Sequence, residues 1–120
     1  MSDRRILIVD DNRDGAEGVC AMLKILGATV AVAYTGRTAL DGLDRFGPDT
    51  MLVDLGLPDM DGCELARQIR ASPVHQRMLL IALTGWGEDQ DYRRTREAGF
   101  DHHLLKPADI HTLRGLLTRS

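Results

Sequence analysis

The chain has 120 residues, of which 43% are hydrophobic and 28% charged, and its formal net charge is −3. This length suits one domain with a single core, and the composition is that of a globular rather than a disordered protein. A net negative charge disfavours nucleic acid as a main ligand, because binding to a phosphate backbone needs a basic surface. We therefore expect one globular domain, residues 1–120, that does not bind nucleic acid directly.

Apolar runs are short throughout the sequence. Runs such as 6-ILIV-9 and 79-LLIAL-83 have four or five residues, far fewer than the roughly 20 that a membrane-spanning helix needs. No charged-then-apolar leader opens the chain, so we expect no secretory signal. Cys20 and Cys63 do not form a CxxC motif, and we interpret both as reduced, buried thiols. Together these features favour a cytoplasmic protein.

Five apolar segments alternate with five segments of helical periodicity. The apolar segments are largely continuous, which is typical of strands buried on both faces of a parallel sheet. In chain order, the predicted strands are residues 5–9, 28–33, 51–53, 78–84 and 101–105.

Apolar residues at spacings of three and four predict a helix after each strand. Stop signals follow these helices: Gly27 ends the first, Gly47-Pro48 the second, and Ser72-Pro73 lies beyond the third. Asp109 is a suitable N-cap for the last helix. In chain order, the helical patterns cover Arg13 to Leu26, Ala39 to Phe46, Leu65 to Ile69, Asp89 to Ala98, and Ile110 to Leu117.

The fourth helical pattern differs from the others in its charge. Arginines gather in 93-RRTR-96 among four acidic residues, which is typical of a solvated helix face rather than a binding patch. Its apolar face is thin, with little beyond Tyr92 and Ala98. The segment between the fourth strand and this helix, Gly85-Trp86-Gly87, reads as a flexible loop. We therefore expect low local stability in this part of the chain.

Alternating strands and helices with short connections predict a parallel sheet, with helices on both faces and right-handed crossovers. Five such units suit an α/β, doubly wound, flavodoxin-like sheet with the strand order 2-1-3-4-5. In such a sheet, ligands bind beyond the carboxyl ends of the strands, at the switch point between strands 1 and 3. The fold therefore predicts where a site lies, but not what it does.

Polar side chains follow the predicted strands at that edge. Asp10 and Asp11 follow the first strand, Asp54 the third, Thr84 ends the fourth and Lys106 follows the fifth. Each of these residues alone has an ordinary explanation, such as a helix-start acid or a surface lysine. The presence of all five at one edge of the sheet has no such explanation. Converging carboxylates repel one another unless a cation lies among them, and Mg²⁺ binds carboxylate and phosphate oxygens. With a hydroxyl and an ammonium nearby, this set predicts phosphoryl transfer onto a carboxylate.

The chain resembles the receiver domains of two-component response regulators, including those fused to hybrid histidine kinases. The matching motifs are 9-VDDN-12, 53-VDLGLPDMDG-62, 82-ALTG-85 and 104-LLKP-107, and the resemblance covers essentially the whole chain. It implies that Asp54 accepts a phosphoryl group, with Mg²⁺ as cofactor, from a phosphohistidine on a histidine kinase or a phosphotransfer protein.

The resemblance also implies roles for the residues around the acceptor. Asp11 would be the direct ligand of Mg²⁺, Asp10 would act through water, and the backbone carbonyl of Gly56 would complete the protein contacts. Thr84 and Lys106 would bind the phosphoryl oxygens once the group arrives. These roles come from the family's motifs, matched position by position.

Further positions concern the loop and the readout. Pro58 and Gly62 would shape the loop, and the peptide before Pro107 is expected to be cis. Family members move an aromatic residue three positions before the lysine, which remodels the face of helix 4, strand 5 and helix 5. A downstream partner, a fused output domain or a second copy of the chain would bind there. Here the position holds His103, and because imidazole titrates near pH ~6.5, we hypothesise a weaker or pH-sensitive switch.

Other classes of protein fit these residues less well. A phosphatase or mutase that works through an aspartyl phosphate would have a second acid two residues after the nucleophile, where Gly56 stands. A flavodoxin would need a Gly/Ser/Thr-rich loop where this chain has Asp10-Asp11-Asn12-Arg13. A transcription factor would need a second domain. We therefore expect a phosphorylation-controlled binding module rather than an enzyme, either free-standing or part of a longer regulator or hybrid kinase.

Overall fold

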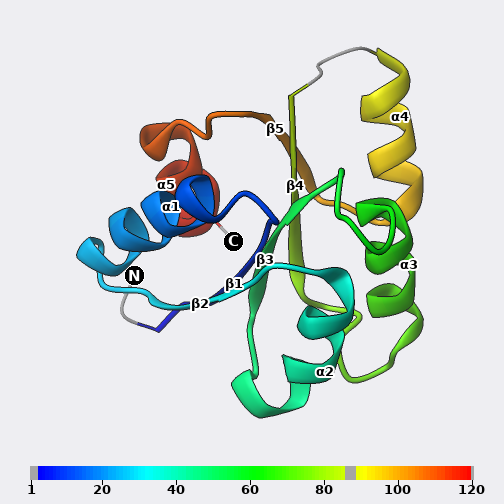
Figure 1. Cartoon of the computed structure of the whole chain (residues 1–120), viewed down its shortest axis with the longest axis horizontal. Helices are drawn as coiled ribbons and strands as arrows, with labels where there is room; N and C mark the ends of the chain where they lie inside the picture. The colour runs from blue at the N-terminus through cyan, green and yellow to red at the C-terminus, as the bar shows by residue number, and fades with distance from the viewer. Residues whose placement is uncertain (1–2, 86–88, 120) are drawn as a thin grey trace.

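The computed structural model describes residues 3–85 and 89–119. Within these ranges five parallel strands form one sheet in the order 2-1-3-4-5, and a helix follows each strand (Figure 1). This is the doubly wound, flavodoxin-like topology that the sequence predicts. Trp86 and Gly87 of the predicted flexible loop lie outside the described residues.

The boundaries of the elements lie close to the predicted ones. The strands are β1 (Arg5–Val9), β2 (Thr29–Ala33), β3 (Thr50–Asp54), β4 (Leu79–Thr84) and β5 (His102–Leu105). The helices are α1 (Arg13–Ile25), α2 (Gly36–Phe46), α3 (Gly62–Ala71), α4 (Asp89–Ala98) and α5 (Ile110–Arg119). The helix α3 starts earlier than its apolar pattern suggests, because Asp61 caps it by accepting a hydrogen bond from the Cys63 N–H.

Helices cover both faces of the sheet. In Figure 1, α1 and α5 lie on one face, and α2, α3 and α4 lie on the other. Successive residues of β1 alternate between the two cores: Ile6 and Ile8 pack with residues of α1 and α5, and Leu7 and Val9 with residues of α2 and α3. All four side chains are buried, so β1 has no polar face, as its continuous apolar run predicts.

Side-chain caps fix where α1, α2 and α5 begin. Asn12 caps α1 by accepting from the Gly15 N–H, and Thr35 caps α2 in the same way. Asp109 accepts hydrogen bonds from the Thr112 hydroxyl and from the first turn of α5, which confirms the predicted cap. These bonds, that of Thr112 first, hold the pKa of Asp109 below its usual value.

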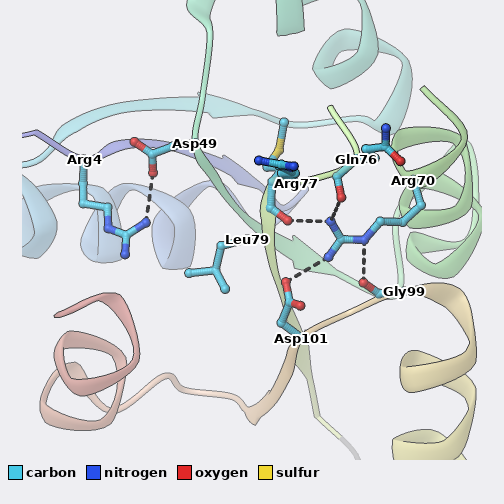
Figure 2. A pocket seen from close by; sticks show the side chains of 9 residues that line it. Arg4, Asp49, Arg70, Gln76, Arg77, Leu79, Gly99 and Asp101 are labelled. Carbon is cyan, nitrogen blue, oxygen red and sulfur yellow. Dashed lines mark hydrogen bonds and ion pairs between the residues drawn. The ribbon is translucent and has the colours of Figure 1, made fainter. Parts of the chain in front are cut away.

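Two arginines tie the amino edge of the sheet together (Figure 2). Arg70 of α3 donates to three backbone carbonyls and pairs with Asp101 at 2.9 Å. Arg4 pairs with Asp49 at 3.3 Å and donates to the carbonyl of Leu117 in α5. Both guanidinium groups line a hollow of about 540 Å³, and their bonds join helix ends to strand starts. The hydrogen bonds and ion pairs of these two arginines therefore give the residues that line this hollow a structural role.

The structure also tests the predictions about the two cysteines and about membrane-spanning helices. Both thiols are free, but only Cys63 is buried, whereas Cys20 is partly exposed, which corrects the prediction for Cys20. Burial raises the pKa of the Cys63 thiol. Among the described residues, none of the helices has the length and apolar character that a membrane crossing requires.

The helix α4 has the thin apolar face that its sequence predicts. Between residues 92 and 98, only Thr95 and Ala98 are buried, and the ring of Tyr92, expected on the apolar face, is 42% exposed. A helix with so few buried apolar contacts is held weakly by hydrophobic packing.

Candidate functional site

The predicted site residues come together at the carboxyl edge of the sheet. β1 and β3 pair through Val9 and Val53, so the next residue on each strand, Asp10 and Asp54, emerges at the same level. The N–H of Asp10 donates to a carbonyl at the end of β2, at 3.0 Å, and this bond continues the sheet to the edge. The position of the two acids is therefore a consequence of the parallel register.

Thr84 and Lys106 reach the same edge from β4 and β5. Thr84 pairs with Leu105, and the N–H of Lys106 donates to the carbonyl of Thr84 at 2.7 Å. Thr84 is 4% exposed and lines the same hollow as Asp54. The Lys106–Pro107 peptide is cis, the geometry that the resemblance implies.

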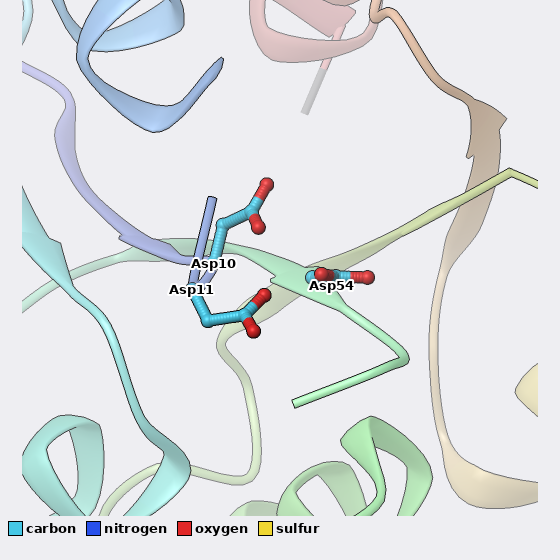
Figure 3. Close-up of side chains that lie close together, drawn as sticks. All are labelled: Asp10, Asp11 and Asp54. Carbon is cyan, nitrogen blue, oxygen red and sulfur yellow. The ribbon is translucent and has the colours of Figure 1, made fainter. Parts of the chain in front are cut away.

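Three carboxylates converge at this edge (Figure 3). One oxygen from each of Asp10, Asp11 and Asp54 lies within 4.8 Å of the others. Asp10 is buried, Asp54 is half-buried and Asp11 is exposed, so the cluster opens to solvent on one side. Such hard oxygen donors, with room for water on the open side, fit the preferences of Mg²⁺.

Lys106 provides the positive charge that lies among these acids. Its Nζ lies 2.9 Å from Oδ2 of Asp10 and 3.1 Å from Oδ2 of Asp54. Burial alone would lower the pKa of Lys106, but the hydrogen bonds to both carboxylates outweigh it and raise the pKa above its usual value. The ammonium of Lys106 is therefore already paired with two carboxylates. From the sequence, only its binding to the oxygens of an arriving phosphoryl group was expected.

The charged form of Asp10 is disfavoured, whereas that of Lys106 is favoured. Burial raises the pKa of its carboxyl group above the usual value, and the Asn12 N–H and Lys106 offset only part of that rise. Ionised Asp10 therefore costs the folded protein free energy that a cation near it would offset.

The loop after Asp54 is tied back to that residue. The N–H of Gly56 donates to Oδ1 of Asp54 at 3.1 Å, and Gly56 pairs with Asp61 in an antiparallel bridge. Pro58 lies exposed in the turn between them. The N–H of Gly62 donates to the carbonyl of Leu55 at 3.0 Å. The loop thus returns to its starting point before α3 begins.

The same loop also fixes the start of α2. Oxygens of Asp59 accept hydrogen bonds from the N–H groups of Arg37 and Gly36, each at 2.9 Å. These two bonds, that of Arg37 first, hold the pKa of Asp59 below its usual value. An acid from one loop therefore supplies acceptors to the first turn of a different helix.

His103 faces α4 from β5. Its ring centroid lies 4.2 Å from that of Tyr92, and its Nδ1 lies 3.0 Å from the hydroxyl of Thr95. That hydroxyl also donates to the carbonyl of Tyr92, so Thr95 links the ring of His103 to the backbone of α4. Nε2 is buried and has no hydrogen-bond partner in the described part of the chain.

Sequence reasoning missed a charged pair beside the site. Arg94 of α4, assigned to a solvated face, forms an ion pair with Asp61 and lines a hollow of about 310 Å³ together with Asp54, Gly56 and Thr84. The position of Asp61 before a helix is a capping signal that could have identified it. No spacing within the arginine run distinguishes Arg94 from its neighbours.

Comparison with known proteins identifies a family and its relatives. The family model described as the response regulator receiver domain matches residues 6–118. The transcriptional regulatory protein TrcR of Mycobacterium tuberculosis is 36% identical, over 97% of this chain. The match takes up 46% of TrcR, so the chain spans about half of that relative's length.

Solved structures with this fold are also similar in sequence. The signal receiver domain of a DNA binding response regulator from Colwellia psychrerythraea 34H has a TM-score of 0.91 at 28% identity, covering 98% of this chain and 97% of that one. The receiver domain of the sensor histidine kinase PA1611 from Pseudomonas aeruginosa PAO1 has a TM-score of 0.87 at 34% identity, covering 97% and 95%. In the latter, a magnesium ion is coordinated in the active site cleft.

Substitution of Gly62 by alanine should destabilise the protein. A Cβ there would lie 2.7 Å from the carbonyl oxygen of Asp54 and 2.8 Å from Cα of Leu55, and backbone cannot move aside easily. We expect a loss of about 1–3 kcal/mol in the free energy of unfolding, measured with urea. Gly56→Ala is the matched control, because within the part of the chain that the structure describes its Cβ would meet only Oδ1 of Asp54, at 3.9 Å. Equal stability of the two variants would contradict this account.

Asp10→Asn should raise the free energy of unfolding in metal-free buffer at neutral pH. Because burial raises the folded-state pKa of Asp10, the cost is fully present above that pKa and disappears below the unfolded value. The gain should therefore shrink as the pH falls through this window. Urea unfolding with a chelator at several pH values measures it, with Asp41→Asn, at an exposed position, as control. A variant less stable than the native protein at pH 7 would disprove the expectation.

Proposed function

The chain belongs to the response regulator receiver domains of two-component signalling, and we propose that it accepts one phosphoryl group on Asp54. The donor would be a phosphohistidine on a histidine kinase or a phosphotransfer protein. One observation carries the proposal: three carboxylates meet within 4.8 Å, and the Lys106 ammonium lies 3.1 Å from Oδ2 of Asp54. This is a nucleophile surrounded by the charges that phosphoryl transfer needs.

The proposed transfer is a displacement at phosphorus. An oxygen of Asp54 attacks and forms a P–O bond, the P–N bond breaks, and the imidazole of the donor leaves with the electron pair. Lys106 is already hydrogen-bonded to Asp54 and would neutralise charge on the phosphoryl oxygens. Thr84, at the end of the neighbouring strand, would donate its hydroxyl to them.

The donor set also supports a magnesium-dependent reaction. Asp10, Asp11 and Asp54 would hold Mg²⁺ with the backbone carbonyl of Gly56. When bound, Mg²⁺ supplies the positive charge that offsets repulsion between the carboxylates and the incoming phosphoryl oxygens. Three acids face one lysine in this cluster, so negative charge is in excess before the phosphoryl group arrives.

We propose that the chain is a binding module and not an enzyme, since its chemistry acts on its own side chain. It would act in the cytoplasm, where histidine kinases present their phosphohistidines. Downstream, a protein partner or a fused output domain would bind the face of α4, β5 and α5, and a second copy of the chain could use the same face. The likeness to the receiver of a sensor histidine kinase supports membership of such a relay.

The proposed readout passes through His103. Phosphorylation adds about 1.5–2 negative charges to Asp54, which would draw the hydroxyl of Thr84 toward them. Thr84 lies on β4 beside β5, where His103 contacts Tyr92 and Thr95 of α4. A change at the strand ends would therefore alter a contact that holds a weakly packed helix.

Phosphorylation of Asp54 can be tested directly. After treatment with acetyl phosphate and Mg²⁺, the native protein should gain the mass of one phosphoryl group by intact-mass spectrometry, and Asp54→Ala should gain none. Asp41→Ala, an exposed acid on α2, should behave like the native protein. Chelation of Mg²⁺, or Asp11→Ala, should slow the gain at least about tenfold. A stable phosphoryl group on Asp54→Ala would overturn the proposal.

The His103 readout can be tested by substitution. The ring of His103 packs on that of Tyr92, and its Nδ1 lies 3.0 Å from the hydroxyl of Thr95. If the readout passes through this contact, the phosphorylation-induced NMR shifts of α4 should be smaller in His103→Ala than in the native protein. His102→Ala, on the opposite face of the strand, should retain them. Shifts of equal size in the native protein and His103→Ala would rule the idea out.

A further inference from the structure

A hollow of about 310 Å³ lies directly beside Asp54, with residues from three elements around it. Asp54 and Gly56 come from the end of β3 and its loop, and Thr84 from the end of β4. Arg94 lines the same hollow from α4. A cationic side chain from a helix therefore borders the space next to the proposed phosphoacceptor, whereas Lys106 approaches Asp54 without lining this hollow.

A short series of contacts connects Arg94 to Asp54. Nη2 of Arg94 lies 2.5 Å from Oδ2 of Asp61, and Asp61 pairs with Gly56 in an antiparallel bridge. The N–H of Gly56 in turn donates to Oδ1 of Asp54 at 3.1 Å. The other oxygen of Asp61 caps α3, which fixes this carboxylate. Asp61 thus holds the guanidinium on the Gly56 side of the site.

The space between the two side chains has no side chain from position 56. Among residues 3–85 and 89–119, a Cβ built on Gly56 would have only Oδ1 of Asp54 within 4 Å, at 3.9 Å. In a chain with a larger residue at this position, that side chain would separate the acceptor from α4.

A simpler explanation of the Arg94–Asp61 pair is a surface salt bridge that only holds α4 to the loop. Both side chains are about half exposed, 50% for Arg94 and 49% for Asp61, and such pairs contribute little to stability. A move of the guanidinium toward a stronger anion would exchange part of this ion pair, and its 3.7 Å contact with Sγ of Cys63, for charge-assisted hydrogen bonds. A phosphoryl group is such an anion, and guanidinium binds phosphate through paired N–H donors.

We propose that Arg94 is an additional phosphoryl-binding residue: with Asp54 phosphorylated, its guanidinium bridges Asp61 and the phosphoryl oxygens. This inference rests on the phosphorylation of Asp54 proposed above and adds a contact that the family motifs do not include. It gives α4 a direct attachment to the modified residue. The helix with the thinnest apolar face would then be held partly by the phosphoryl group itself.

Beryllium fluoride, which binds an aspartate as a phosphoryl mimic, provides the test. Its affinity for the full chain in Mg²⁺ would be measured by fluorine NMR titration for the native protein, Arg94→Gln and Arg94→Lys. Arg94→Gln should bind about tenfold more weakly, because one charge-assisted hydrogen bond is lost. Arg94→Lys should recover part of that loss. Arg96→Gln, an exposed arginine of the same helix, is the matched control and should bind like the native protein.

The outcomes separate this inference from the function on which it rests. Failure of the native protein to bind beryllium fluoride, or binding that survives Asp54→Ala, would overturn the proposed function and this inference together. Normal binding by the native protein and by Arg94→Gln would overturn the role of Arg94 alone. Thermal unfolding without beryllium fluoride distinguishes a structural role: a melting temperature that falls while the affinity stays unchanged would also refute the proposal. Affinity lost in Arg94→Gln and partly restored by lysine supports it.

Discussion

Electrostatic repulsion among three carboxylates at one edge of the sheet is the constraint on which the site depends. The parallel register brings Asp10 and Asp54 to the same level, and Asp11 follows directly. Like charges at this separation are unfavourable, most of all for buried Asp10. Lys106 partly compensates them from β5. The folded chain therefore holds an arrangement that is favourable only when positive charge is supplied, which makes it responsive to a cation.

The fold could be predicted from the sequence because its signals are local and repeated. Continuous apolar runs such as that of β1 indicate burial on both faces, and helical periodicity after each run implies crossovers. The errors lie at boundaries set by polar contacts: Thr50 belongs to β3, and α3 begins at Gly62 because Asp61 caps it. Burial was also misjudged for Cys20, since periodicity shows which face a residue occupies but not how completely a neighbour covers it.

Within the site, the strand-end residues were predictable and the loop contacts were not. Parallel strands end at one edge, so an acid after β1 and another on β3 must approach each other. By contrast, Asp59 contacts the start of α2 and Asp61 contacts Arg94. These residues are far apart in the sequence, and neither helical nor strand periodicity relates them. Those pairings depend on how the loop folds back. Sequence composition classed Arg94 with its solvated neighbours, and only the packing of α4 against α3 distinguishes it.

The loop between Asp54 and Asp61 has a consequence for how this chain tolerates change. Surface loops ordinarily accept insertions and deletions. This one supplies acceptors to the start of α2 through Asp59, begins α3 through Asp61, and brings Gly62 against the backbone of Asp54. It is therefore a spacer of fixed length: one residue more or fewer would move at least one helix start out of reach. Related sequences should vary in composition here but keep the same number of residues, and a redesigned receiver should leave this interval unaltered.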